Sequence, residues 1–294
     1  MQRQDLQDLH PPKASWLELV IMALSEDIGE GDVTSQSTVD SHLKASANMT
    51  AREDMTICGV NIAGAAFHQL DSNMEIETLY GDGSIVKAGQ VIMKINGRAR
   101  EILTAERVAL NFIQHLSGIA TKTSHFCSFL QGLDTKLLDT RKTTPGLRLL
   151  EKYAVLCGGG TNHRVGLFDM VMIKDNHLQA LQQITDAAIK TAVEKARQAH
   201  PDLKIEVEAD NLNQVRNAVD AGADIILLDN MSLEQMKAAV QICKDKCKTE
   251  ASGGITENSL RQIAESGVDF ISSGALTHSA RNVDIGLDFQ MHKY

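Results

Sequence analysis

Short apolar runs alternate with helical patterns along the second half of the 294-residue chain. Strands with nearly continuous apolar residues that alternate with helices are typical of a parallel sheet covered by helices. The apolar runs, each ending in a polar residue, are 136–139, 170–174, 204–208, 225–229, 249–252 and 269–273. The helical segments between the later runs are 178–199, 212–221, 232–246 and 259–266.

The ends of these runs distinguish an open sheet from a barrel. All six end in side chains or glycines that are able to take part in chemistry. An open doubly wound sheet needs such residues mainly near its switch point, whereas a (β/α) barrel directs the carboxyl end of every strand to one mouth. The pattern therefore favours a barrel, and six strands in place of eight predict an incomplete one.

The first part of the chain, from about residue 15 to residue 116, has a mixed pattern. Apolar spacing indicates helices at 16–24, 63–70 and 101–114, and strand-like runs lie at 49–57 and 90–95. We predict an N-terminal domain of helices and strands over residues 1–116 and an α/β barrel domain over 117–276. The tail at 277–294 is predicted to return to the first domain.

Charge and cysteine content narrow the class of protein. The formal net charge of −9 argues against a general nucleic-acid or acidic-membrane binder, although a local cationic pocket can still hold a small phosphorylated substrate. Cys243 and Cys247 have no second pair of metal ligands, so a zinc site is disfavoured. Residues 1–12 do not resemble a secretory signal, and no apolar run reaches about 18 residues. We therefore expect a cytoplasmic protein.

Cationic side chains gather next to the predicted strand ends. Arg offers a fork for a planar carboxylate, and Lys offers a point charge that suits a phosphate. Any one of these residues could be an ordinary surface cation, but their clustering predicts a site for a small ligand with several negative charges. The cations are Arg141, Lys142, His163, Arg164 and Lys174.

Carboxylates follow two of the predicted strands. Alternation places Lys204, Glu206 and Glu208 on one face, which would point into a barrel and require partners or a metal there, unless 204–208 is a solvated edge strand. Asp229 ends the next strand, where it could merely cap the following helix, as Asn230 or Ser232 also could. Together Glu208 and Asp229 make a plausible pair for Mg²⁺ shared with a phosphorylated ligand.

Glycine-containing loops follow the last two predicted strands. Backbone N–H groups exposed by glycine can cradle a phosphate, and the last βα loops are the common phosphate site of barrels. The loops therefore predict a phosphate site. They contain Ser252, Gly253, Gly254, Ser272, Ser273 and Gly274.

The chain resembles the quinolinate phosphoribosyltransferase family over nearly its whole length. The second half carries this resemblance at 139–148 (DTRKTTPGLR), 159–164 (GGTNHR), 174–177 (KDNH), 206–208 (EVE), 227–230 (LLDN) and 250–254 (EASGG). The first half carries it at 26–29 (EDIG), 31–34 (GDVT) and 104–111 (TAERVALN).

The resemblance implies a type II phosphoribosyltransferase, with an N-terminal α/β sandwich and an incomplete α/β barrel. The implied reaction converts quinolinate and 5-phosphoribosyl-1-pyrophosphate to nicotinate mononucleotide, pyrophosphate and CO₂ in de novo NAD synthesis, with Mg²⁺. It also implies at least a homodimer, in which Arg107 reaches the barrel mouth of the neighbouring subunit.

Residue roles are implied by the same matching motifs. Arg107, Arg141, His163, Arg164 and Lys174 would hold quinolinate. Lys142 would face the pyrophosphate or ribose, and Glu208 and Asp229 would engage the ribose and Mg²⁺, directly or through water. Ser252, Gly253, Gly254, Ser273 and Gly274 would cradle the 5-phosphate, with Ser272 beside them.

Three alternatives stay open at this point. A phosphosugar isomerase or aldolase would use Lys174 as a Schiff-base lysine, but it would leave the motifs at 139–142 and 162–164 without a role. A phosphoribosyltransferase for another pyridine or for a metal-cofactor pathway is a related alternative. A protein that binds these ligands without turnover is the third, and the intact carboxylate pair argues against it.

Overall fold

The computed structural model describes residue 6, residues 9–182 and residues 187–291. The chain divides into two compact units, which we call unit 1 and unit 2. Unit 1 contains residues 1–125, 143–159 and 276–294, and unit 2 contains residues 126–142 and 160–275. The sequence-predicted boundary at residue 116 falls inside one long helix, α5 (Ala99–Ser128).

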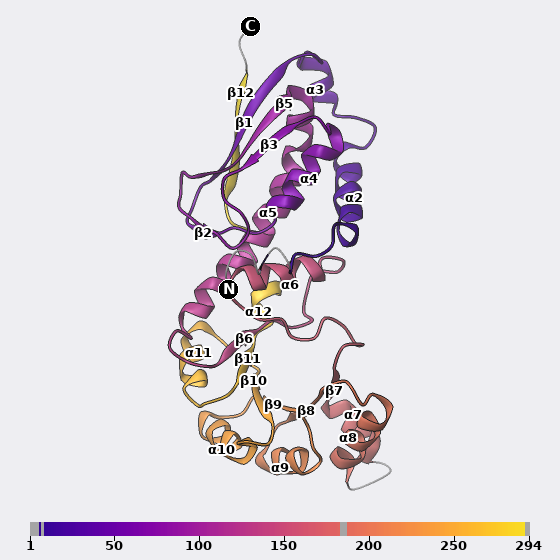
Figure 1. Ribbon diagram of the computed structural model, residues 1–294, viewed down its shortest axis with the longest axis vertical. Helices are drawn as coiled ribbons and strands as arrows, with labels where there is room; N and C mark the ends of the chain where they lie inside the picture. The colour runs from indigo at the N-terminus through magenta and orange to yellow at the C-terminus, as the bar shows by residue number, and fades with distance from the viewer. Residues whose placement is uncertain (1–5, 7–8, 183–186, 292–294) are drawn as a thin grey trace. The chain divides into compact units, whose positions relative to one another are not determined.

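Unit 1 is built on a four-stranded antiparallel sheet (Figure 1). Its order is β12 (Ile285–Met291), β1 (Lys44–Ala51), β5 (Val91–Arg98) and β3 (Glu75–Thr78). The C-terminal strand pairs with β1 from Ala45↔Met291 to Ala51↔Ile285, so the tail of the chain completes this sheet. A second, two-stranded sheet pairs β2 (Met55–Thr56) with β4 (Ile85–Val86).

Helices α4 and α5 cover one face of the larger sheet (Figure 1). Helix α5 buries a stripe at three- and four-residue spacing, including Ile102, Ala105, Ala109 and Ile113, which is why it packs against a core. The helices of this unit are η1 (Lys13–Ser15), α2 (Leu17–Ile28), α3 (Val33–Thr38), α4 (Val60–Leu70), α5, α6 (Arg148–Cys157) and most of α12 (Ala275–His278).

Helix α6 packs closely on α5, and a glycine permits this. A Cβ atom on Gly158 would lie 2.4 Å from the carbonyl oxygen of Ala120, so a larger residue would force the two helices apart. No helix was predicted from the sequence at the position of α6.

Unit 2 contains a six-stranded parallel sheet, as predicted. The two outer strands, β6 and β7, do not pair with each other among the described residues, so the barrel is incomplete. The order is β6 (Lys136–Leu138), β11 (Phe270–Ser272), β10 (Lys248–Ser252), β9 (Ile225–Asp229), β8 (Ile205–Ala209) and β7 (Val171–Ile173).

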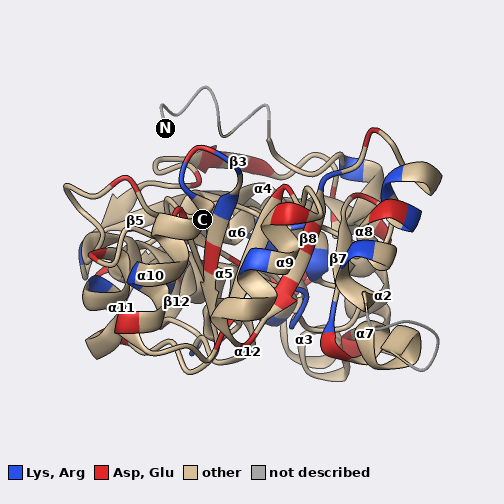
Figure 2. Cartoon of the chain, turned by 90° about the horizontal axis from the view of Figure 1, so that it is seen from below, with Lys and Arg blue, Asp and Glu red and all other residues tan. Residues whose placement is uncertain are grey.

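Helices lie outside this sheet (Figure 1), and basic and acidic residues are interspersed along helices such as α8 and α9 (Figure 2). The predicted helix at 178–199 is two helices, and residues 183–186 between them lie outside the described residues. The helices are α7 (Asp175–Gln182), α8 (Ala188–Ala199), α9 (Leu212–Asp220), α10 (Leu233–Cys243) and α11 (Glu257–Ala264).

The register of the strands separates a polar face from an apolar face. Glu208 pairs with Leu227, and Asp229 pairs with Ser252, so these residues point to the same side of the sheet. That side carries Met172, Glu206, Glu208, Asp229, Glu250, Ser252 and Ser272, by the pairing of neighbouring strands. The opposite side carries buried apolar residues: Leu137, Ile205, Val207, Ile226, Leu228, Ala251 and Ile271.

Candidate functional site

The predicted site residues of unit 2 lie at the carboxyl ends of its strands. Because these strands are parallel, their carboxyl ends share one edge of the sheet. Arg141 and Lys142 follow β6, Lys174 follows β7, and Asp229 ends β9. The two glycine-containing loops follow β10 and β11. Strand β8 lies between β7 and β9, so the edge-strand alternative for 204–208 is wrong.

One ring nitrogen of His163 lies close to two buried glutamates, Glu206 and Glu250. Its Nε2 atom is 3.0 Å from Glu206 Oε2 and 3.4 Å from Glu250 Oε2. The His163 side chain is 7% exposed, Glu206 is 0% exposed and Glu250 is 1% exposed. The backbone N–H of His163 donates to Asp139 Oδ1 at 2.8 Å, which fixes the loop to the end of β6.

His163, Glu206 and Glu250 influence one another's pKa values. Burial opposes the charged form of His163, but the hydrogen bond with Glu206 and the charge of the nearby Glu250 carboxylate outweigh burial and raise the pKa of His163 to about 9. Burial raises the pKa of Glu206 to about 7, against the lowering effect of His163. The Nε2 proton faces Glu206, whereas Nδ1 lies 2.7 Å from the backbone nitrogen of Arg164. In the neutral ring, Nδ1 accepts from that backbone N–H, so the ring proton lies on Nε2.

Two arginines belong to the same cationic group. Burial lowers the pKa of Arg164, and the nearby Arg141 charge lowers it further. The Arg164 guanidinium donates to the carbonyl oxygen of Met170 at 3.2 Å. Side chains that repel each other in this way are expected to bind an anionic ligand, because the ligand relieves the repulsion.

The carboxylates that end β8 and β9 have different partners. Lys174 Nζ is 3.0 Å from Glu208 Oε2, which joins a predicted cation to a predicted carboxylate. Asp229 Oδ2 accepts a hydrogen bond from Asn230 Nδ2 at 3.0 Å. Ser232 caps the next helix, with its hydroxyl accepting from the backbone N–H of Gln235. Asp229 is therefore not the cap, and its carboxylate stays at the strand end.

The loop after β10 requires glycine. Gly253 has φ 91° and Gly254 has φ 58°, in the left-handed region that favours glycine. A Cβ atom on Gly253 would lie 2.2 Å from Asn230 Oδ1, so the backbone approaches the end of β9 closely. Asn230 is itself left-handed, at φ 52°, and its N–H donates to the carbonyl oxygen of Ser252.

The loop after β11 is hydrogen-bonded to the last residue of the neighbouring strand β6. The Ser273 N–H donates to the carbonyl oxygen of Leu138 at 3.0 Å, and Ser272 and Ser273 are buried. Gly274 follows them and precedes α12. Both predicted phosphate loops therefore lie after neighbouring strands at the same edge as the cations and carboxylates.

Arg107 lies apart from these residues in the chain, on α5 of unit 1, and its side chain is exposed. The next residue, Val108, lines a cavity of about 340 Å³ within unit 1. The cavity is lined by Ala23, Glu26, Asp27, Val108, Asn111, Phe112, His115, Thr144, Leu147 and Asn282.

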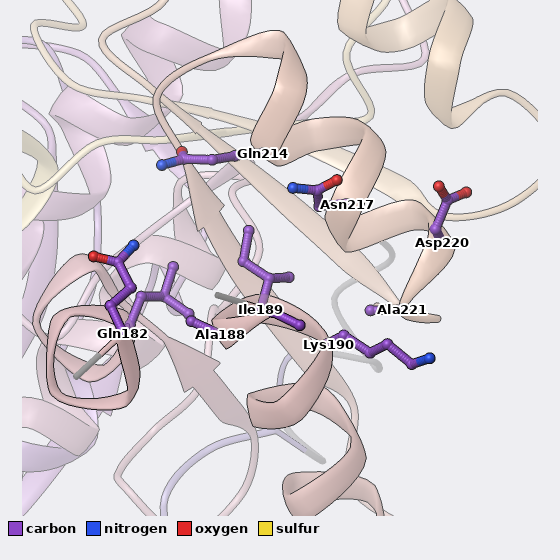
Figure 3. Close-up of a pocket in the computed structure, with 10 residues that line it drawn as sticks. Gln182, Ala188, Ile189, Lys190, Gln214, Asn217, Asp220 and Ala221 are labelled. Carbon is purple, nitrogen blue, oxygen red and sulfur yellow. The ribbon is translucent and has the colours of Figure 1, made fainter. Parts of the chain in front are cut away.

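Unit 2 has another cavity, of about 490 Å³, between α7, α8 and α9 (Figure 3). Its lining includes Gln182, Lys190, Asn217 and Asp220, and none of the predicted site residues. In unit 1, Cys58, Asp82 and Cys157 bring three metal-ligand atoms within 4.8 Å of one another. The Asp82 carboxylate already accepts hydrogen bonds from the backbone of Gly59 and from Tyr153, which gives it a structural role.

No role was predicted from the sequence for Glu250 or Asp139, although both lie in the motifs of the family resemblance. A signal was available for Glu250, because it lies two residues before Ser252 on the same strand and therefore on the same face. Asp139 is fully buried and acts through the backbone of His163. No pattern in the sequence indicates that either residue contacts His163.

Two family models match the chain. Residues 32–117 match the N-terminal domain of quinolinate phosphoribosyl transferase, and residues 119–288 match its C-terminal domain. The chain belongs to the quinolinate phosphoribosyltransferase family. The incomplete barrel and the N-terminal domain that the sequence predicted are those of this family.

Relatives and a solved structure agree with this membership. The chain is 45% identical over 264 residues to a probable nicotinate-nucleotide pyrophosphorylase (carboxylating) of Bacillus subtilis, covering 90% of this chain and 89% of the relative. It is 42% identical over 287 residues to a chloroplastic enzyme of that name from Oryza sativa, covering 92% and 76%. The structure of the nicotinate-nucleotide pyrophosphorylase from Francisella tularensis superposes with a TM-score of 0.90 at 45% identity, covering 95% and 98%.

Proposed function

We propose that this member of the quinolinate phosphoribosyltransferase family transfers phosphoribose to quinolinate with loss of CO₂, giving nicotinate mononucleotide and pyrophosphate. The observation that carries the proposal is the shared edge in unit 2. Cations for a dicarboxylate, carboxylates for a ribose and glycine loops for a phosphate all follow strands of one parallel sheet. This set matches the charges of the two substrates, and the alternatives explain only parts of it.

Quinolinate would bind to the cations. Its two carboxylates carry two negative charges, and forked guanidinium groups such as Arg141 and Arg164 suit them. Lys174 and His163 add positive charge at the same edge, and Arg107 would complete the set. Lys142, whose side chain is exposed, would face the pyrophosphate or the ribose.

The ribose would lie near Glu208 and Asp229. Loss of pyrophosphate leaves positive charge on the ribose carbon, and carboxylates held beside it stabilise that charge. The nitrogen of the pyridine ring forms the new bond to this carbon. Because the substrate supplies the nucleophile, the site needs none of its own, and the Schiff-base role considered for Lys174 is unnecessary.

Mg²⁺ fits this part of the site. Mg²⁺ prefers oxygen ligands and is usually held by one or two carboxylates together with substrate phosphates. Glu208 and Asp229 are oxygen donors on one face of adjacent strands, and they would hold the ion directly or through water. When bound, the ion neutralises charge on the leaving pyrophosphate.

Decarboxylation would follow from the same placement. Bonding of the ring nitrogen to the ribose makes the nitrogen cationic, and that charge stabilises the carbanion left at the neighbouring ring carbon when CO₂ departs. A proton from solvent would then complete the product. The protein has to hold the pyridine ring in one orientation, with its nitrogen facing the ribose carbon. The 5-phosphate would be held by Ser252, Gly253, Gly254, Ser272, Ser273 and Gly274.

The assembly and the compartment are also proposals. We propose a homodimer in which Arg107 of one subunit reaches the site of its partner. The described residues contain no helix long and apolar enough to cross a membrane. A cytoplasmic location stays a prediction, since the relative from Oryza sativa is named as chloroplastic.

A product assay tests the function. The purified protein is incubated with Mg²⁺, 5-phosphoribosyl-1-pyrophosphate and either quinolinate or nicotinate, and nicotinate mononucleotide and CO₂ are measured. We expect both products with quinolinate only, and no product after Mg²⁺ is removed with EDTA. Product with nicotinate alone would overturn the two-carboxylate part of the proposal. No product with either substrate would overturn the whole proposal.

A further inference from the structure

Two buried glutamates under His163 have no part in the chemistry proposed above. Glu206 lies on β8 and Glu250 on β10, with β9 between them, and the register directs both to the polar face of the sheet. Both are buried to 99% or more, and both direct a carboxylate oxygen at the same ring nitrogen of His163. Neither carries a role that the substrates require directly.

The remaining carboxylate oxygens of this pair are unsatisfied. Among the described residues, Glu206 Oε1 and both oxygens of Glu250 are buried without a hydrogen-bond partner. Burying a carboxylate in this way is costly, and apolar side chains of similar volume would stabilise a core at least as well. Stability therefore does not explain why two acids lie here, and a role in the site does.

We propose that Glu206 and Glu250 are positioning residues, which hold the His163 ring and the adjoining Arg164 in the geometry that binds a pyridine dicarboxylate. The proposal rests on the proposed function. Glu206 accepts from Nε2 at 3.0 Å, and the backbone nitrogen of Arg164 lies 2.7 Å from Nδ1. The contact with Glu206 at Nε2 therefore sets the orientation of the His163 ring. The ring in turn holds the backbone of Arg164 through Nδ1.

The second glutamate supports the first. Glu250 Oε2 is 3.4 Å from Nε2, outside hydrogen-bond geometry, so its effect is mainly electrostatic. The two acids together place negative charge behind a group of cations that repel one another, including Arg141 and Arg164. This charge keeps the cations assembled before the anionic substrate arrives.

Isosteric variants test the proposal. Glu206→Gln and Glu250→Gln remove the charge and keep the side-chain volume. Each should raise KM for quinolinate by about tenfold or more, the effect of losing one charge-assisted interaction. KM for 5-phosphoribosyl-1-pyrophosphate should change by less than about twofold, because its proposed ligands, Glu208 and Asp229, are untouched. A parallel change in both KM values would overturn the proposal.

The matched control is Glu194→Gln on α8. Glu194 is exposed, at 63%, and among the described residues it forms a surface pair with Lys190 at 3.8 Å. This variant should have wild-type KM values. If Glu206→Gln fails to fold, Glu250→Gln still decides the matter, because the Glu250 carboxylate makes no hydrogen bond whose loss would unfold the protein.

A spectroscopic measurement separates positioning from other outcomes and needs no turnover. In ¹⁵N spectra of histidine-labelled protein, the neutral form of His163 should carry its proton on Nε2 alone, and the variants should show exchange between the two neutral tautomers. The same spectrum should persist in EDTA. A change on chelation would overturn the proposal in favour of a cation held by the three side chains, which lie within 4.8 Å. If wild-type protein makes no product but the spectra behave as expected, the proposed function fails while positioning stands.

Discussion

His115 of α5 hydrogen-bonds to Glu151 of α6, with 2.9 Å between Nε2 and Oε1. The other oxygen of Glu151 accepts from the backbone N–H of Thr144 at 3.2 Å. Glu151 is completely buried and His115 is 24% exposed. One acid therefore joins the long helix that carries Arg107 to the segment that follows Arg141 and Lys142 in the chain.

The first prediction concerns pH and stability. The hydrogen bond with Glu151 outweighs burial and raises the pKa of His115 above its usual 6.5. A raised folded-state pKa gives stability that is complete below the unfolded-state pKa and is lost as pH rises through the folded-state pKa. His115→Gln keeps a donor but cannot become charged. It should therefore lose about 1–2 kcal/mol relative to wild type at pH 6 and less at pH 9.5.

Thermal unfolding at the two pH values measures this difference. For a chain of this size, each 1 kcal/mol corresponds to a shift in Tm of roughly 2–4 °C. His200→Gln is the matched control, because His200 is exposed at the end of α8. An equal Tm difference between wild type and His115→Gln at both pH values would show that the charge of His115 contributes nothing to stability.

The second prediction compares two adjacent glycines. Both have left-handed φ angles, but a Cβ atom on Gly253 would also collide with Asn230, whereas one on Gly254 would meet nothing within 4 Å. Gly254→Ala should cost about 1 kcal/mol of backbone strain. Gly253→Ala should in addition displace Asn230 and the neighbouring Asp229, raising KM for 5-phosphoribosyl-1-pyrophosphate by on the order of tenfold or more.

Steady-state kinetics on the two variants gives the comparison directly. The quinolinate KM should change little in either, because the proposed quinolinate ligands follow other strands. Equal effects of the two substitutions on the phosphoribosyl substrate would mean that strain alone, and not the approach to Asn230, governs this loop.

The sequence predicted the parts of unit 2 that depend on local pattern. Strand β9 is Ile225–Asp229 as predicted, because a run of apolar residues that ends in Asp admits few other structures. The alternation in β8 also held, with Ile205 and Val207 on the apolar face and Glu206 and Glu208 on the other. A period of two is enough to assign a face once a strand is central.

Pairing between distant segments could not be predicted in the same detail. Nothing near Glu250 in the chain indicates that its carboxylate meets His163, because that contact depends on strand order and register. The predicted strand at 49–57 is two strands, β1 and β2, which belong to different sheets. Residues 52–54 between them are Arg, Glu and Asp, and this charged run marks the change of sheet.

The third prediction concerns the shape of the Arg141 side chain. A guanidinium forks onto a carboxylate, whereas an ammonium offers a point charge. Arg141→Lys should therefore keep the positive charge and still raise the quinolinate Kd by about tenfold, and Arg141→Ala should raise it by about a hundredfold or more. Calorimetric titration of quinolinate into folded protein, checked by circular dichroism, measures both. Wild-type affinity in the alanine variant would remove Arg141 from the site.

The fourth prediction tests whether Arg107 acts on a partner's site. Arg107→Ala and Asp229→Asn should each inactivate a homodimer, one through α5 of unit 1 and the other through β9 of unit 2. If Arg107 crosses the interface, a mixed dimer has one site with an intact barrel and an intact arginine. Random mixing makes about half of the dimers mixed, so activity should recover to roughly a quarter of wild type.

The control for this experiment is a mixture of Arg141→Ala and Asp229→Asn, which change residues of the same unit. Every site in its mixed dimers keeps one defect, so no activity should return whichever way Arg107 points. The two mixtures differ only in which arginine is replaced, Arg107 or Arg141. Subunit exchange takes place in both, so it cannot explain a difference between them. Recovery in the first mixture and none in the second requires a site built from two chains. Failure of both, in dimers shown to be mixed by differential tagging, would place Arg107 in the site of its own subunit.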